Sequence, residues 1–185
     1  PLVALWGFGA HAGPRSQPSI DVLQATRERC GWQRLHWQGD ALLQPGGLEL
    51  DLSAIAKGFG VDHVAAWLRD QQIDAALVEV GGELAGYGRK PDGQPWRVLV
   101  ESAPEEDAGP DTPPRVLALH GKAVATSGDR WHQYSTDGQA YSHSLDPRTG
   151  MPVRQVAAAV TVVAEGALHA DAWGTALTRL GAEAA

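Results

Sequence analysis

Residues 75–88 read AALVEVGGELAGYG, and this stretch does most to decide the fold class. Its first six residues are mostly apolar, as in a buried strand, and they stop at the glycine pair Gly81-Gly82. A second strand is expected over residues 84–88. A third is expected over residues 96–101, after the turn KPDG at residues 90–93. Short strands joined by turns argue against a regular alternation of strands and helices.

Helix signals lie on both sides of this stretch. Residues 21–30 begin at a possible N-cap, Asp21, and stop before a glycine, while residues 56–71 and 167–180 form longer patterns. Apolar side chains recur at helical spacing in the second helix and predict a stripe that faces the core. This stripe consists of Val61, Val64, Ala65 and Leu68. Short strands mixed with three helices predict an α+β fold with mixed or antiparallel sheets.

Other short strands are expected along the rest of the chain. They cover residues 32–37, 47–52, 116–119, 123–126, 128–137 and 156–163, with one more ending at Tyr141. Residues 103–114 are rich in proline and acidic residues, so we expect a surface loop there. We find no run of apolar residues long enough to span a membrane.

The overall composition bounds the class of protein. The chain has 185 residues, of which 43% are hydrophobic and 20% are charged, which suits one domain or a compact pair of subdomains. The net charge is -7, and we find no cluster of Lys and Arg. We therefore expect no nucleic-acid partner, because binding phosphates over a surface needs a basic patch. The single cysteine, Cys30, excludes a disulfide within the chain.

Residues 51–60, DLSAIAKGFG, lie where a strand is expected to lead into the second helix. Free N–H groups at a helix N-terminus favour phosphate, and Lys57 would add a mobile positive charge. A plain capped helix with Lys57 in solvent explains the same residues. Gly81 and Gly82 permit positive φ and close approach of a ligand to the backbone, although a simple tight turn is equally compatible with them.

Polar and turn-forming residues are dense over residues 124–129 and 141–152. Thr126, Ser127 and Asp129 place three polar side chains at the end of an expected strand. His143 precedes a turn predicted over residues 146–150, whose rigid φ angles would fix its direction. A histidine with a pKa near neutral can act as a general base.

Asp171 and Thr175 are four residues apart on the last predicted helix, so both side chains can point at one site. A carboxylate and a hydroxyl are hard oxygen donors of the kind that Mg²⁺ takes. The alternative is that Asp171 stabilises its own helix through the helix dipole. On the view that Asp171 is a helix-surface carboxylate, we expect its substitution to leave the fold nearly intact.

Six segments together resemble the ApbE family of FAD:protein FMN transferases and related flavin-trafficking proteins. The matching segments are residues 5–8, 51–60, 80–83, 125–128, 143–152 and 171–177, in the order of the family. The most specific of them is HSLDPRTGMP, at residues 143–152. The resemblance implies a two-lobed α+β fold with FAD in the cleft between the lobes. It implies one ApbE-like domain over residues 1–185, without the N-terminal region and the extreme C-terminus of the family.

The resemblance also assigns roles to individual residues. It implies a Mg²⁺ site made of the Ala54 carbonyl, Asp171 and Thr175, and it places Lys57 in contact with the flavin. His143 matches the histidine linked to the transfer step, and Ser144 lies next to the FAD. Gly81 and Gly82 complete the set that we expect to bind this ligand.

The implied activity is Mg²⁺-dependent transfer of FMN from FAD to a Ser or Thr hydroxyl, with release of AMP. The acceptor would be a flavin-carrying subunit of a membrane redox complex. The full-length protein would be periplasmic and attached to the inner membrane. Two alternatives remain open: hydrolysis of FAD to FMN and AMP at the same site, and a non-catalytic FAD-binding carrier.

Overall fold

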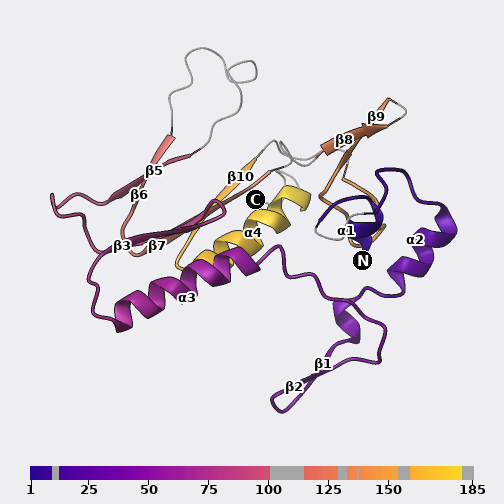
Figure 1. Ribbon diagram of the computed structural model, residues 1–185, viewed down its shortest axis with the longest axis horizontal. Coiled ribbons are helices and arrows are strands. Elements are labelled where there is room, and N and C mark those ends of the chain that lie inside the picture. The colour runs from indigo at the N-terminus through magenta and orange to yellow at the C-terminus, as the bar shows by residue number, and fades with distance from the viewer. Residues whose placement is uncertain (10–12, 101–114, 129–132, 137, 154–158, 181–185) are drawn as a thin grey trace. The chain divides into compact units, whose positions relative to one another are not determined.

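The computed structural model describes residues 1–9, 13–100, 115–128, 133–136, 138–153 and 159–180 (Figure 1). The chain divides into two compact units. Unit 1 comprises Pro1–Asp51 and Asp129–Gln155, and unit 2 comprises Leu52–Gly128 and Val156–Ala185. None of the helices in the described ranges combines the length and the apolar character needed to cross a membrane.

Unit 2 is built on a four-stranded antiparallel sheet in the order β10-β7-β4-β3. These strands span Val160–Ala164, Lys122–Ser127, Glu83–Tyr87 and Ala76–Val80 respectively. The hairpin of β3 and β4, at one edge of this sheet, turns at Gly81 and Gly82, whose φ angles are +60° and +100°. The strands predicted over residues 75–80 and 84–88 are therefore confirmed, and the structure pairs them with each other. Strands β5 (Trp96–Val100) and β6 (Arg115–Leu119) form a separate antiparallel pair.

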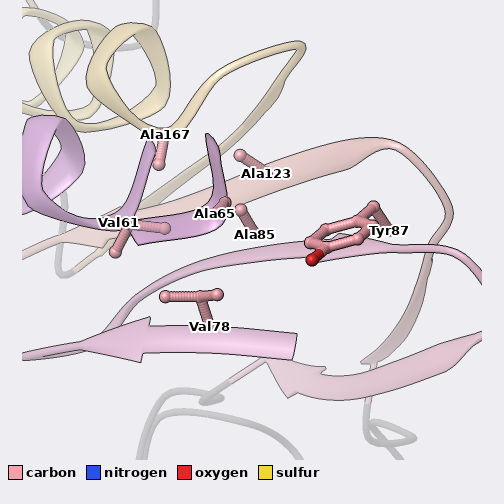
Figure 2. Close-up of a cluster of buried hydrophobic side chains, with 7 residues drawn as sticks. All are labelled: Val61, Ala65, Val78, Ala85, Tyr87, Ala123 and Ala167. Atoms are coloured by element: carbon pink, nitrogen blue, oxygen red, sulfur yellow. The ribbon is translucent and has the colours of Figure 1, made fainter. Parts of the chain in front are cut away.

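Two helices, α3 (Ala56–Asp70) and α4 (Ala167–Leu180), pack against each other and against this sheet (Figure 1). Figure 2 shows the core between them, in which side chains of α3 meet those of the strands and the first residue of α4. The core residues are Val61, Ala65, Val78, Ala85, Tyr87, Ala123 and Ala167. Both helices were predicted within one residue of their bounds. The predicted stripe is wrong at Val64, which is 41% exposed because it lies on the outer side of α3.

Unit 1 has less regular structure and an aromatic core. Its helices are α1 (Leu2–Leu5), α2 (Ile20–Arg27) and the 3₁₀ turn η1 (Trp32–Arg34). Two hairpins accompany them: β1 (His36–Gln38) with β2 (Ala41–Leu43), and β8 (Gln133–Thr136) with β9 (Gln139–Ser142). The core residues are Leu2, Trp6, Phe8, Tyr134, Tyr141 and Leu145. Helices with antiparallel sheets in both units confirm the α+β class.

Local predictions were wrong mainly in unit 1. Ser19, and not Asp21, caps α2, because its hydroxyl accepts the N–H of Val22 at 3.4 Å. Residues 47–52 form no strand, since Leu50 is 60% exposed and no sheet lies against it. The predicted loop at residues 103–114 lies outside the described residues. So does the first part of the strand predicted over residues 156–163.

We predict that Gly58→Ala destabilises unit 2. An added Cβ would lie 2.3 Å from the carbonyl oxygen of Ala167, so the backbones of α3 and α4 would have to separate. Overpacking of this kind typically costs about 1–3 kcal/mol. Gly60→Ala is the matched control, because nothing lies within 4 Å of its added Cβ and alanine favours a helix. Urea unfolding should show a loss for Gly58→Ala and none for Gly60→Ala; equal stabilities would contradict the prediction.

Candidate cation and phosphate site

The N-terminus of α3 is capped by a carboxylate from α4. Asp171 is 2% exposed, and its Oδ2 accepts the backbone N–H of Gly58 at 3.0 Å. The N–H of Gly58 therefore does not donate to the carbonyl of Ala54, four residues earlier. This leaves the Ala54 carbonyl oxygen available to another partner, beside a helix end that favours negative charge.

A second carboxylate caps α4 in the opposite direction. Oδ1 and Oδ2 of Asp62, on α3, accept the N–H groups of Ala167 and Leu168 at 2.8 and 2.9 Å. Each helix thus supplies the N-terminal cap of the other. We call Asp62 and Asp171 the reciprocal caps. They fix the first turns of both helices relative to each other, because each hydrogen bond joins one helix's side chain to the other helix's backbone.

Thr175 lies one turn after Asp171 on the same face of α4. Its Oγ1 is 3.5 Å from the Oγ of Ser127, at the end of β7. Gly174 permits this approach, because an added Cβ would lie 2.8 Å from the Ser127 hydroxyl. Thr126, next to Ser127, instead pairs with Thr161 across the sheet at 3.0 Å, and Asp129 lies outside the described residues.

These residues fit a hard divalent cation. Oδ1 of Asp171 has no hydrogen-bond partner among the described residues, so it can act as a ligand while Oδ2 caps α3. The Thr175 hydroxyl and the Ala54 carbonyl are oxygen donors of the kind that Mg²⁺ accepts. No group of three or more His, Cys, Asp or Glu side chains in the described ranges could hold a metal. Of the predicted ligands, only Asp171 is one of these four residue types, so the Mg²⁺ site stays a prediction.

Lys57 lies in the first turn of α3 and forms an ion pair with Glu83, the first residue of β4. Its Nζ is 2.6 Å from Oε1 of Glu83 and 3.5 Å from the carbonyl oxygen of Gly81. Glu83 is 2% exposed. Burial raises the pKa of the Glu83 carboxyl, Lys57 opposes the rise, and the charge of Asp171 adds to it. Lys57 is therefore held by a buried partner, and its predicted contact with a ligand stays a prediction.

The glycine turn lies beside this ion pair. A Cβ added to Gly81 would lie 3.1 Å from Cδ of Lys57, so the absence of a side chain makes room for the lysine. The N–H of Gly82 donates to Oε1 of Glu79 at 2.8 Å. Positive φ at both glycines was expected on either interpretation of the pair, as a ligand contact or as a tight turn. The structure shows the turn.

His143 and Ser144 belong to unit 1, immediately after β9. The imidazole ring is 6.3 Å from the ring of Phe8 in an edge-on arrangement. Ser144 is buried; its N–H donates to the Ser142 hydroxyl at 2.9 Å, and its carbonyl accepts the N–H of Val153. The backbone on both sides of the Ser144 side chain is thus held by hydrogen bonds.

The turn predicted after His143 is present. The carbonyl of Asp146 accepts the N–H of Gly150 at 2.7 Å, and the carboxylate of Asp146 pairs with Arg148. This pairing lowers the pKa of the Asp146 carboxyl. The buried indole N–H of Trp6 donates to the carbonyl of Gly150 at 2.8 Å and ties the turn to the aromatic core.

The structure brings Lys57, Gly81 and Asp171 together around the first turn of α3, and it places Thr175 beside Ser127. Sequence reasoning missed Asp62 as a cap and Glu83 as the partner of Lys57. Glu83 follows the glycine pair in a recognisable motif, which could have drawn attention to it. Asp62 stands within a helical pattern and gives no comparable signal.

The family model described as "ApbE family" matches residues 1–185. Among curated proteins, the chain is 39% identical to an FAD:protein FMN transferase of Vibrio cholerae, over 99% of this chain and 54% of that protein. It is 36% identical to a protein of the same name from Klebsiella pneumoniae, over 100% and 53%. The chain thus spans about half the length of these curated relatives.

Two solved structures are similar to this one. The apo form of the Pseudomonas stutzeri flavinyl transferase ApbE matches with a TM-score of 0.87 and 41% identity, over 99% of this chain and 56% of that one. The flavin transferase ApbE from Vibrio cholerae matches with a TM-score of 0.85 and 39% identity, over 98% and 57%.

Burial of Asp171 contradicts the view that it is a helix-surface carboxylate, on which we expected its substitution to leave the fold nearly intact. We predict that Asp171→Ala, measured by urea unfolding in EDTA, loses about 1–3 kcal/mol, because the Gly58 N–H is left without its acceptor. Asp171→Asn keeps an acceptor oxygen and should lose less. Asp70→Ala, at the exposed C-terminal end of α3, is the control and should be near neutral. If Asp171→Ala were as stable as the unsubstituted chain, the cap would contribute nothing to the free energy of unfolding.

Proposed function

We propose, because this chain belongs to the ApbE family, that it carries the FMN-transferring site of an FAD:protein FMN transferase. The observation that carries the proposal is the match of the family model over all 185 residues. The names of the relatives above point to the same activity. The reaction would join the FMN phosphorus of FAD to a Ser or Thr hydroxyl of an acceptor protein and release AMP.

Unit 2 suits the phosphate end of such a substrate. Asp171 and Thr175 offer oxygen ligands beside the N-terminus of α3, whose helix dipole favours negative charge. Mg²⁺, when bound, would offset the negative charge that develops on the leaving phosphate. Asp171 would serve twice in this proposal, through Oδ2 as the cap of α3 and through Oδ1 as a ligand.

The proposed reaction also needs a group that handles the proton. An attacking hydroxyl must lose its proton as the new bond to phosphorus forms, and a neutral imidazole can accept it. We assign this role to His143, with the Trp6-anchored turn after it as its support. Ser144 would lie near the FAD, as in our sequence prediction.

The acceptor and the place of action follow from the family resemblance. We propose a flavin-carrying subunit of a membrane redox complex as the acceptor, and the periplasmic face of the inner membrane as the place where transfer occurs.

Mass spectrometry of an acceptor domain after incubation with this chain, FAD and Mg²⁺ tests the activity. We expect the acceptor to gain the mass of FMN less water on one Ser or Thr, with one AMP released for each transfer. EDTA should abolish the transfer, and excess Mg²⁺ should restore it. Release of FMN and AMP without an acceptor adduct would indicate a hydrolase instead. Retention of FAD without turnover in excess Mg²⁺ would indicate a carrier.

His143→Ala tests the general base. We predict that the variant keeps most of its FAD affinity but loses about 10² to 10⁴ in transfer rate, the usual worth of general-base assistance. Fluorescence titration of FAD measures the binding. If binding collapses while transfer persists, His143 is a ligand contact and not the base.

A further inference from the structure

Glu83 has a buried carboxylate that its protein partners satisfy only in part. Its side chain starts at the first residue of β4, directly after the glycine turn, and is 2% exposed. Lys57 holds Oε1 at 2.6 Å. Oε2 is buried and has no hydrogen-bond partner among the described residues. Buried polar atoms in native proteins nearly always have a partner, so an orphaned oxygen indicates a bound water, ion or ligand.

Glu83 and Asp171 meet neighbouring residues of the first turn of α3, because Glu83 pairs with Lys57 and Asp171 accepts the N–H of Gly58. The negative charge of Asp171 acts on Glu83, so the two carboxylates belong to one electrostatic cluster. Lys57 is the only cation with a contact to either of them in the described part of the chain. With both carboxylates ionised, the cluster carries a net charge of about -1, which a divalent cation would offset.

The two carboxylates differ in what they can do. Oδ1 of Asp171 has no hydrogen bond to the described part of the chain, and the hydroxyl of Thr175 lies one turn away on the same helix, so Asp171 can bind a cation directly. Glu83 is held in place by Lys57 beside the turn at Gly81 and comes from a different element, the sheet. Mg²⁺ keeps several of its water molecules when bound, and carboxylates outside the first coordination shell commonly accept hydrogen bonds from them.

We propose that Glu83 is a positioning residue for the cation at Asp171, accepting through Oε2 a hydrogen bond from a water molecule of the cation's coordination shell. Lys57 neutralises the other oxygen and keeps the carboxylate from turning away. This inference rests on the cation site of the proposed function, and it adds a residue that the predicted ligand set of Ala54, Asp171 and Thr175 did not include.

Isothermal titration with MgCl₂ tests this proposal without reference to turnover. The chain, Glu83→Gln and Asp171→Asn are compared, with the Mg²⁺-dependent rise in Tm as a second readout. We expect Glu83→Gln to weaken Mg²⁺ binding about tenfold or more, which is typical for loss of such a carboxylate. Glu165→Gln is the matched control: it removes the same charge from a glutamate that pairs with Lys122 but is 82% exposed. Its Mg²⁺ affinity should be that of the unsubstituted chain.

A double variant covers the case in which Glu83→Gln fails to fold. Lys57→Met with Glu83→Gln removes both charges of the ion pair, so neither charge is left without its partner, and it should show the same loss of Mg²⁺ affinity. Wild-type Mg²⁺ affinity in a folded Glu83 variant, with Asp171→Asn impaired, overturns this inference alone. No Mg²⁺ binding by the unsubstituted chain, or wild-type binding by Asp171→Asn, overturns the proposed cation site and this inference with it.

Discussion

The hydrogen bonds of the reciprocal caps, Asp62 and Asp171, are the constraint on which the rest of unit 2 depends. A helix N-terminus has backbone N–H groups without partners inside the helix, and burying them without acceptors is costly. Here a carboxylate of each helix accepts the free N–H groups of the other. These bonds hold α3 and α4 close together. The close approach requires glycine at position 58, because a side chain there would collide with the backbone of Ala167.

This arrangement also explains why a candidate cation site can form at that crossing. The first turns of two helices concentrate partial positive charge, so a buried carboxylate is tolerated there at lower cost than elsewhere in a core. Asp171 uses one oxygen for the cap, and its other oxygen has no hydrogen-bond partner among the described residues. The close approach of α4 to β7 at Gly174 brings the hydroxyl of Ser127 to Thr175. Stability and the proposed ligand geometry thus depend on the same side chain.

In unit 1, an aromatic cluster holds the segment that carries His143. Trp6 stacks on Tyr141 with ring centroids 5.4 Å apart, and Tyr141 stacks in turn on Tyr134. The indole N–H of Trp6 reaches the carbonyl of Gly150, in the turn that follows His143. The aromatic core therefore anchors a segment that has little regular structure of its own. The Trp-Gly-Phe segment near the start of the chain and the turn after His143 are parts of one packed cluster.

The sequence alone determined the features that depend on local periodicity and turn chemistry. The helical spacing of α3 and α4, the strand that ends at Gly81 and Gly82, and the turn that ends at Gly150 are all encoded within short stretches, so they could be predicted. The spacing of Asp171 and Thr175 placed both on one helix face for the same reason. The family resemblance came from short motifs in a fixed order, and the family match over the whole chain confirmed it.

Only the tertiary structure decided which partners these residues meet. Lys57 and Glu83 are 26 residues apart, and Gly58 and Asp171 are 113 apart, so no local pattern could pair them. Asp171 looked like a surface carboxylate, because the residues next to it in the sequence do not show that α3 packs over it. Val64 and Leu50 fitted apolar periodicities but are exposed. Periodicity shows which residues share one face of an element, but only the packing decides whether that face is covered.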